Sequence, residues 1–484
     1  MLFNSIDFAI FLPIVFILYW FVFKKSYKFQ NVLIVIASLV FYGWWDWRFL
    51  SLILASSILD YVVGMLLENQ ENTTKRKLLL AASLVGNFGL LGFFKYFNFF
   101  VDNFINAFTF FGFEFQAQSL NIILPVGISF YTFQTLSYSI DVYRRQMKPT
   151  RNFIAFMAFV SFFPQLVAGP IERAINLLPQ FFKKRTLRYP EAVDGMKQLL
   201  WGFFKKIVIA DNCAIFANLI FNNSSSYSGS TLLLGVLFFT FQIYCDFSGY
   251  SDIAIGTAKL LGFQIMTNFA FPYFSRDIAE FWRRWHISLS TWFRDYLYIP
   301  LGGSKGNKLQ RIRNTLIIFI VSGFWHGANW TFIVWGALNA IYFLPLLLTD
   351  KNRKNMGIIA QGKLIPPLKE LVSLIITFSL TVFAWIFFRA LSLDHAFSYI
   401  GTILSPSLFT IPVFPDRQRA LLVIILAIIF MTIEWLGREG RYAIDKLTAS
   451  LKKPFRWAFY YSIVLSIYLF ANNSQVIEFI YFQF

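Results

Sequence analysis

A long apolar run at residues 315–348 limits the folds open to this chain more than any other feature of the sequence. The run has 34 residues, whereas about 20 apolar residues cross the hydrocarbon core of a bilayer as one helix. Its middle contains Gly323, His326, Gly327 and Asn329. Ionisable side chains at membrane depth usually face a cavity or a polar partner, because their burial in hydrocarbon is costly. We therefore predict a helical hairpin with His326 at its inner end, and one long tilted helix is the alternative.

The composition of the whole chain assigns it to the membrane. Its 484 residues are 57% hydrophobic and only 14% charged, and such a chain cannot bury its apolar surface in a soluble core. Hydrophobic stretches recur without a long polar segment between them, so we predict one membrane-embedded domain over residues 1–484. The first stretch, residues 6–23, lacks a basic leader and a small-residue cleavage site and is interpreted as a retained helix. Cys213 and Cys245 lie in apolar surroundings and are predicted to be core residues, with no metal-binding spacing.

The net charge of +18 would suggest nucleic acid as the partner of a soluble protein, but its distribution here favours the membrane. Basic clusters alternate with basic-poor loops, and Lys and Arg concentrate in cytoplasmic loops of membrane proteins. With the N-terminus outside the cytoplasm, the first three basic clusters all fall on the cytoplasmic side. We expect no nucleic-acid partner. The membrane crossings that give this topology are at about residues 6–23, 30–45, 49–67, 78–97 and 120–140.

The next hydrophobic segment is predicted to enter the membrane and turn back. A further basic cluster at residues 183–188 would lie on the wrong side if residues 153–169 crossed. The segment ends in FPQLVAGP at residues 163–170, where two prolines and a glycine interrupt a helix. Broken backbone at membrane depth must be satisfied by protein or by a water-filled cavity. We therefore expect a re-entrant hairpin that lines the interior of the fold.

Two further segments carry polar chemistry. In residues 281–296, Trp282, His286, Leu289 and Phe293 follow the spacing of one helix face, and the neighbouring tryptophans and arginines are typical of an interfacial helix. Residues 244–252, YCDFSGYSD, place two carboxylates and several hydroxyls directly after an apolar run. These polar groups require a cavity or partners.

His286 and His326 are therefore the candidate catalytic residues of a membrane-embedded reaction chamber. Imidazole titrates near neutrality and can take a proton from a hydroxyl nucleophile or return one to a leaving group. Asn329, one helical turn beyond His326, is placed to orient the ring or to stabilise a developing oxyanion. The competing interpretation is that each histidine only hydrogen-bonds a neighbour. His395 lies near a loop and is predicted to be structural.

Several motifs in the chain closely resemble the membrane-bound O-acyltransferases, and within them the alginate O-acetyltransferase type. They cover most of the chain, in the right order. The resemblance implies an all-α polytopic bundle around a deep funnel, with His326 at the essential position and His286 at the second functional position. The segments that carry it are residues 41–46, 130–141, 163–170, 244–252, 281–303 and 323–330.

The resemblance also implies substrates, partners and a location. The donor would be acetyl-CoA on the cytoplasmic side, with no bound cofactor and no metal. The acetyl group would pass to an extracytoplasmic serine esterase-like acetyltransferase, which esterifies an exported polysaccharide. The protein would lie in the bacterial cytoplasmic (inner) membrane, with the bilayer as its surroundings. The candidate substrate-binding residues are Trp285, Trp325, Asn329, Asp246 and Ser248.

Alternatives remain open for both the mechanism and the function. His326 can act as a general base toward an acceptor hydroxyl, or as a nucleophile that forms an acyl-imidazole first. A related function is D-alanyl transfer to teichoic acid. A more distant one is a transporter or flippase for a lipid-linked saccharide, since broken helices at mid-membrane are also typical of transporters; the two halves of the sequence show no convincing repeat. A scaffold in a secretion complex is compatible with enzyme function.

Overall fold

The regular structure of this chain is helical. The computed structural model describes residues 1–112, 120–167, 169–471 and 479–480, and these contain no strand. They group into two units, one of Met1–Ala192 with Thr257–Met266 and the other of Val193–Gly256 with Thr267–Phe484. The predicted all-α class is confirmed. One domain over residues 1–484 and a deep funnel stay predictions.

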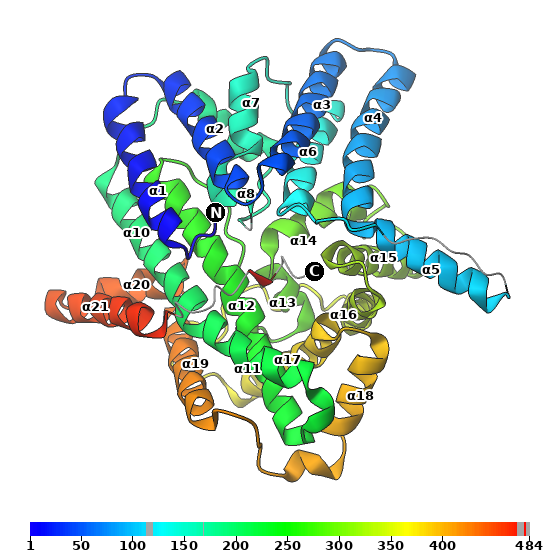
Figure 1. Cartoon of the computed structure of the whole chain (residues 1–484), viewed down its shortest axis with the longest axis vertical. Helices are drawn as coiled ribbons and strands as arrows, with labels where there is room; N and C mark the ends of the chain where they lie inside the picture. The colour runs from blue at the N-terminus through cyan, green and yellow to red at the C-terminus, as the bar shows by residue number, and fades with distance from the viewer. Residues whose placement is uncertain (113–119, 168, 472–478, 481–484) are drawn as a thin grey trace. The chain divides into compact units, whose positions relative to one another are not determined.

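The described residues of the first unit include nine complete α-helices, shown in blue to green in Figure 1, together with the ends of two helices that continue into the second unit. The predicted crossings overlap α1 with the π-helical turn that follows it, α2, α3, α4 and α6. The described residues 120–127 before α6 are not helical, and of these five helices only α3 and α4 belong to segments long and apolar enough to cross a bilayer. Residues 113–119 and residue 168, the latter in the FPQLVAGP motif, lie outside the described part of the chain. The helices are α1 Ile6–Ile17, α2 Tyr27–Gly43, α3 Leu50–Glu68, α4 Thr73–Leu91, α5 Phe97–Phe110, α6 Ile128–Tyr143, α7 Phe153–Val160, α8 Phe163–Leu166 and α9 Ala174–Leu177.

The interrupted segment of this unit is buried, as predicted for the residues before the motif's glycine. Helix α7 ends at Val160 and the short α8 follows at Phe163. The carbonyl oxygen of Phe159 accepts hydrogen bonds from the side-chain amides of Gln134, at 2.7 Å, and Gln165, at 3.1 Å. The protein thus satisfies backbone that the helix break leaves without a helical partner, as a low-dielectric interior requires.

The second unit contains the remaining helices, and α10 Tyr189–Phe203 enters it from the first. A π-helical turn, η5 Phe204–Ala210, joins α10 to α11. The other helices of this unit are α11 Asp211–Asn222, α12 Gly229–Leu260, α13 Ile278–Arg284, α14 Ile287–Phe293, α15 Lys308–His326, α16 Trp330–Leu348, α17 Leu368–Arg389, α18 Leu393–Ile403, α19 Arg417–Gly437, α20 Ala443–Ser450 and α21 Lys453–Phe470.

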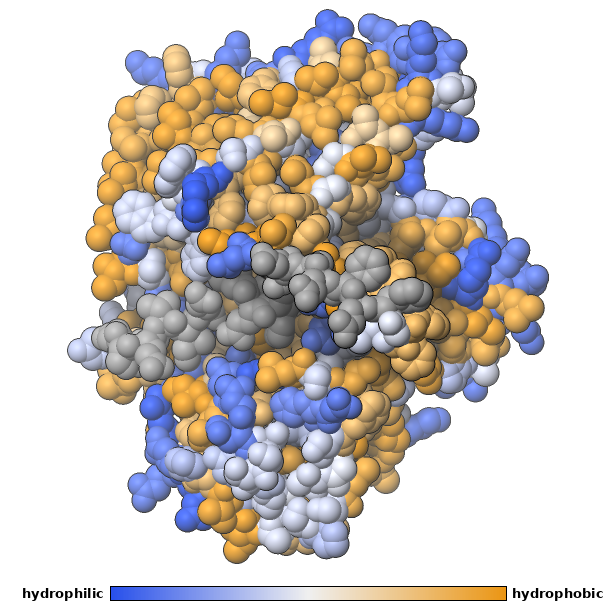
Figure 2. Space-filling model, turned by 45° about the vertical axis from the view of Figure 1, so that its right-hand side comes forward, coloured by the Kyte–Doolittle hydropathy of each residue, from blue (hydrophilic) through white to orange (hydrophobic). Residues whose placement is uncertain are grey.

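The described residues include six helices that are long and apolar enough to cross a bilayer. Wide areas of the face drawn in Figure 2 are hydrophobic, as expected of a surface in contact with lipid. The chain is therefore a polytopic membrane protein. The six spans are Trp47–Glu68, Thr73–Phe110, Gly229–Leu260, Trp330–Leu348, Leu368–Arg389 and Arg417–Gly437.

The apolar run at residues 315–348 forms a helical hairpin. Helix α15 ends at His326 and α16 begins at Trp330, so the predicted hairpin is confirmed and the single tilted helix is wrong. The two arms approach closely at two glycines: a Cβ atom at Gly323 would overlap the carbonyl oxygen of Phe332, and one at Gly336 would overlap that of Phe319. The absence of side chains at these two positions lets the arms pack together, with His326 at the inner end.

Candidate active site

The predicted helix over residues 281–296 is broken at His286. Helix α13 ends at Arg284, α14 begins at Ile287, and His286 between them has left-handed backbone, with φ 44° and ψ 54°. The single-helix prediction is therefore wrong. The break is possible because Asn268 replaces the helical acceptors: its carbonyl oxygen accepts from Ile287 N–H at 2.9 Å, and its side-chain Oδ1 accepts from Ser288 N–H at 3.2 Å.

The same Asn268 fixes which nitrogen of His286 carries the proton. A backbone N–H can only donate, so the Asn268 atom that meets Ser288 N–H must be the amide oxygen. This oxygen also lies 3.1 Å from His286 Nδ1, which must therefore donate. In the neutral ring the lone pair is then on Nε2. The amide nitrogen of Asn268 faces Ser251 Oγ at 3.2 Å, which agrees with this orientation.

The structure brings the two candidate histidines together. The ring centroids of His286 and His326 are 6.4 Å apart, and the residues are 1% and 2% exposed. His326 is the last residue of α15 and lies among aromatic rings, with centroids at 4.9 Å for Trp325, 5.2 Å for Trp335 and 5.3 Å for Phe388. Two imidazoles from distant segments thus belong to one buried cluster of aromatic side chains, although their catalytic roles stay predictions.

Burial also determines the charge of His286, which lies outside the six apolar spans. Removal of the ring from water lowers the pKa of His286 to about 3, because a low-dielectric site disfavours the charged imidazolium. The ring is therefore neutral at physiological pH. A neutral imidazole with its lone pair on Nε2 can accept a hydrogen bond or a proton.

The predicted substrate-binding residues of the two histidine segments have different surroundings. Trp325 borders both histidines, with its ring 6.1 Å from that of His286. Trp285 is buried and packs in a tryptophan cluster, 5.1 Å from Trp385. Asn329 caps α16: its Oδ1 accepts from Thr331 N–H and its Nδ2 donates to Leu391 O, both at 3.0 Å. Contacts of the three residues with substrate stay predictions.

Asp246 and Ser248, the other two predicted substrate-binding residues, belong to a buried ionic cluster between α12 and η5. Lys206 Nζ lies 2.8 Å from both Asp246 and Asp211. Lys205 Nζ lies 2.5 Å from Asp252 and donates to Ser248 Oγ. The two carboxylates of residues 244–252 and the Ser248 hydroxyl thus have partners, as their sequence required. Any contact of Asp246 or Ser248 with substrate stays a prediction.

Lys206 remains charged within this cluster. Burial alone would lower its pKa, but Asp211 and Asp246 attract the ammonium strongly enough to raise the pKa above its ordinary value. Sequence analysis did not identify Lys205 and Lys206 as the partners of these carboxylates. Two adjacent lysines in an apolar stretch are a signal that buried carboxylates lie nearby, since charges this deep are paired.

The remaining candidates are structural. His395 lies near the start of α18, where its Nε2 is 3.0 Å from Ser224 Oγ and its Nδ1 accepts from Leu391 N–H, in agreement with the structural role predicted for it. Cys213 and Cys245 are buried, also as predicted. In the part of the chain that the structure describes, no group of three or more His, Cys, Asp or Glu side chains could hold a metal ion.

The fold and the site together define a polytopic helical membrane protein with two buried histidines close to each other. The model of the membrane-bound O-acyltransferase family matches residues 45–388. The chain therefore belongs to the membrane-bound O-acyltransferase family, and it is an O-acyltransferase. This confirms the resemblance inferred from its motifs.

Three relatives of this chain carry names that specify the transferred group or the acceptor. The chain is 41% identical, over 84% of its length and 78% of the relative's, to a protein of Azotobacter vinelandii named "Probable alginate O-acetylase". It is 37% identical to the peptidoglycan O-acetyltransferase of Helicobacter pylori, over 82% of this chain and 78% of the relative. The teichoic acid D-alanyltransferase of Streptococcus thermophilus is 30% identical over 56% of this chain and 70% of the relative.

Proposed function

We propose that this O-acyltransferase moves an acetyl group across the bacterial inner membrane. The donor is acetyl-CoA on the cytoplasmic side, and the acetyl group serves O-acetylation of an exported polysaccharide, such as an alginate-like polymer or another cell-envelope glycan. The observation that carries the proposal is the buried pair His286 and His326, with ring centroids 6.4 Å apart, in a chain with O-acetyl-transferring relatives over more than four fifths of its length. The N-terminus lies outside the cytoplasm, and an extracytoplasmic serine esterase-like partner receives the acetyl group.

His326 performs the central proton transfer in the simplest route. Its neutral imidazole takes the proton of an acceptor hydroxyl, the oxygen attacks the thioester carbonyl, and the carbon–sulfur bond breaks. The proton held by His326 then passes to the departing thiolate. In the second route His326 attacks the thioester itself, the carbon–sulfur bond breaks and the thiolate leaves. The hydroxyl oxygen then attacks the acyl-imidazole, the carbon–nitrogen bond breaks, and the hydroxyl proton passes to the thiolate. Both routes need an unprotonated ring nitrogen at the start.

His286 acts beside it as a neutral hydrogen-bond acceptor. Asn268 holds the proton on His286 Nδ1, so Nε2 presents a lone pair, and this lone pair can orient the hydroxyl or the second imidazole during proton transfer. Burial strengthens such hydrogen bonds, because electrostatic interactions are stronger in a low-dielectric interior than in water.

The alternatives have less support. D-alanyl transfer rests on a relative that matches 56% of this chain, against 84% for the alginate O-acetylase. Membership in an acyltransferase family disfavours a saccharide transporter or flippase. A scaffold role in a secretion complex coexists with catalysis and would appear as a phenotype that survives loss of His326.

The test is the O-acetyl content of exported polysaccharide in a deletion strain that carries wild-type protein, His326→Ala, His286→Ala or His395→Ala, with membrane levels of the four proteins matched. His395 is the control, because it is the only other histidine of the chain and its ring contacts the Ser224 hydroxyl and neither of the other two histidines. We expect acetylation to be lost in the first two variants and retained in the third.

Retained acetylation in His326→Ala would show that this histidine is structural and would favour the transporter or the scaffold function instead. D-alanine esters in place of acetyl esters on the wild-type product would identify the alternative donor. Loss of acetylation in all three variants at matched levels would remove the assignment of chemistry to the pocket of His286 and His326.

A further inference from the structure

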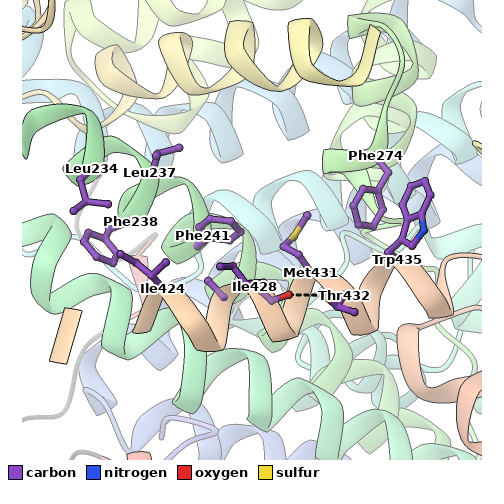
Figure 3. A pocket seen from close by; sticks show the side chains of 11 residues that line it. Leu234, Leu237, Phe238, Phe241, Phe274, Ile424, Ile428, Met431, Thr432 and Trp435 are labelled. Atoms are coloured by element: carbon purple, nitrogen blue, oxygen red, sulfur yellow. Dashed lines mark hydrogen bonds between the residues drawn. The ribbon is translucent and has the colours of Figure 1, made fainter. Parts of the chain in front are cut away.

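An apolar groove on the second unit lies apart from the histidine pocket. It has a volume of about 400 Å³, and it runs between residues 234–241 of α12 and residues 424–435 of α19. Figure 3 shows the side chains of the two helices along its length, with Phe274 and Trp435 together at one end. Their rings are 5.1 Å apart and close that end.

The lining of the groove offers nothing to a polar ligand. The residues of α12 and α19 that form it are aliphatic or aromatic except for Met431 and Thr432, and the Thr432 hydroxyl donates to Ile428 O at 2.8 Å. Thr432 therefore has its hydroxyl occupied by its own helix. Both walls belong to helices that are able to cross the bilayer, and Ile428 is 61% exposed. The groove therefore opens toward the lipid.

The length of the groove matches one leaflet of a bilayer. Ile424 and Trp435 are 11 positions apart on α19, which corresponds to about 16 Å along a helix that rises about 1.5 Å per residue. Half of a hydrocarbon core of about 30 Å is about 15 Å. An acyl chain that enters at one membrane surface and ends at the midplane would fill this length.

The Trp435 end has the composition of a membrane surface. Trp435 Nε1 donates to Leu364 O at 2.8 Å, and the guanidinium of Arg438 lies 3.9 Å from the Trp435 ring centre. Tryptophan and arginine concentrate at the boundary between headgroups and hydrocarbon. Leu364, whose carbonyl oxygen accepts the hydrogen bond from Trp435, is 66% exposed, which a lipid interface tolerates and water does not favour. The acyl chain therefore enters at Trp435.

Two exposed lysines belong to the chain segment at this entrance: the carbonyl oxygen of Lys363 accepts from the Arg438 guanidinium, and Lys369 directly precedes Glu370 at the start of α17. Each neighbouring carboxylate has an arginine beside it: Glu439, which accepts from Gly362 N–H at 2.7 Å, follows Arg438 in the chain, and Glu370 lies 3.1 Å from Arg276. The lysines thus leave positive charge at the mouth of an apolar groove. This combination matches an anionic headgroup above an acyl chain, as in basic sites for acidic lipids.

We propose that the groove between α12 and α19 binds one acyl chain of an anionic glycerophospholipid, whose headgroup lies at Lys363 and Lys369. The site is independent of the acyl-transfer chemistry proposed above. The lipid fills space that would otherwise be empty between two spanning helices, and it ties α19 to the leaflet at the Trp435 end.

The experiment titrates delipidated full-length protein with phosphatidylglycerol or phosphatidylcholine in detergent and counts bound lipids by native mass spectrometry. Ala427→Phe fills the groove from α19. Ile429→Phe adds the same side chain to the same helix at an exposed position that does not line the groove, and it serves as the matched control. Lys363→Gln with Lys369→Gln removes the headgroup charges without changing the walls.

Wild-type protein and Ile429→Phe should each bind one phosphatidylglycerol in preference to phosphatidylcholine. Ala427→Phe should weaken this binding by about tenfold or more because it occupies the acyl site, and the lysine pair should weaken it by about tenfold while leaving phosphatidylcholine binding unchanged. Equal binding by Ala427→Phe and Ile429→Phe would overturn the proposal, as would a lysine variant that keeps full preference for the anionic lipid. If Ala427→Phe fails to fold, Leu237→Trp fills the groove from α12. A lipid-free dimer that phosphatidylglycerol does not dissociate would assign the groove to a second copy of the chain.

Discussion

Asn268 Oδ1 lies 3.1 Å from His286 Nδ1 and at the same time accepts the backbone N–H of Ser288. One amide oxygen therefore both starts α14 and sets the tautomer of the histidine that precedes it. Residues that orient a functional imidazole through its second nitrogen control which nitrogen is available for chemistry. Asn268 is a positioning residue in this sense, since it acts through His286.

Asn268→Asp should shift the pH dependence of activity. A carboxylate beside His286 Nδ1 favours the charged imidazolium and raises the pKa of His286 from about 3 toward neutrality. Protonated His286 loses its Nε2 lone pair, so activity should fall at a higher pH on the acidic side than in wild type. The measurement is kcat against pH for the purified protein. Ser251→Ala is the control, because it removes another partner of Asn268 without adding charge, and its profile should keep the wild-type acidic limb.

Gly323→Ala should separate the arms of the hairpin. The added methyl group overlaps the carbonyl oxygen of Phe332, which is backbone and cannot rotate away, so α15 and α16 must move apart. This separates His326, at the end of α15, from Trp335 on α16. We expect destabilisation of about 1–3 kcal/mol and lower kcat at pH values where wild type is fully active. Gly89→Ala is the control, since a Cβ atom there meets nothing within 4 Å and alanine favours the helix by up to about 1 kcal/mol. Thermal unfolding in detergent should place the two variants on opposite sides of wild type.

The hairpin could be predicted from sequence, whereas the break at His286 could not. Residues 315–348 are too long for one crossing and contain glycines at their middle, and these are local signals. The spacing of Trp282, His286, Leu289 and Phe293 is equally regular, but the acceptor that interrupts it is Asn268, 18 positions before His286. A helix pattern carries no information about such a distant hydrogen bond.

The polar partners of α12 also come from a distant segment of the chain and could not be predicted from a local pattern. The sequence required partners for Asp246 and Ser248, yet it did not identify them, because Lys205 and Lys206 lie about 40 positions earlier and meet them only through packing of η5 against α12. The pairing of His286 with His326 was suggested by shared chemistry and by the family resemblance. Their separation of 6.4 Å follows from the fold.

His326→Ala should lower kcat by at least about hundredfold, the usual contribution of a positioned acid or base, while the KM for the acetyl donor changes little. His326 lies at the end of α15 among aromatic rings, so the alanine variant leaves a cavity and some loss of stability is expected as well. His326→Gln retains most of the volume and separates the two effects. A glutamine variant that recovers stability but not kcat supports a chemical role, whereas recovery of both would make His326 a packing residue.

Lys206→Met should be the most destabilising of these substitutions. It removes the cation that lies 2.8 Å from both Asp211 and Asp246 and leaves two buried carboxylates near each other. Breaking a buried ion pair by removing one partner costs about 3–5 kcal/mol, because the remaining charge stays without compensation. Arg145→Met is the matched control: its pairing with Glu71 is solvent-exposed on both sides, and such pairs contribute at most about 1 kcal/mol. Thermal unfolding of the two variants in detergent, at equal protein concentration, measures the difference. If Lys206→Met unfolds at the wild-type temperature, the two carboxylates have bound protons in place of the ammonium. The variant should then lose thermal stability as the pH is raised, because deprotonation restores the unpaired negative charges.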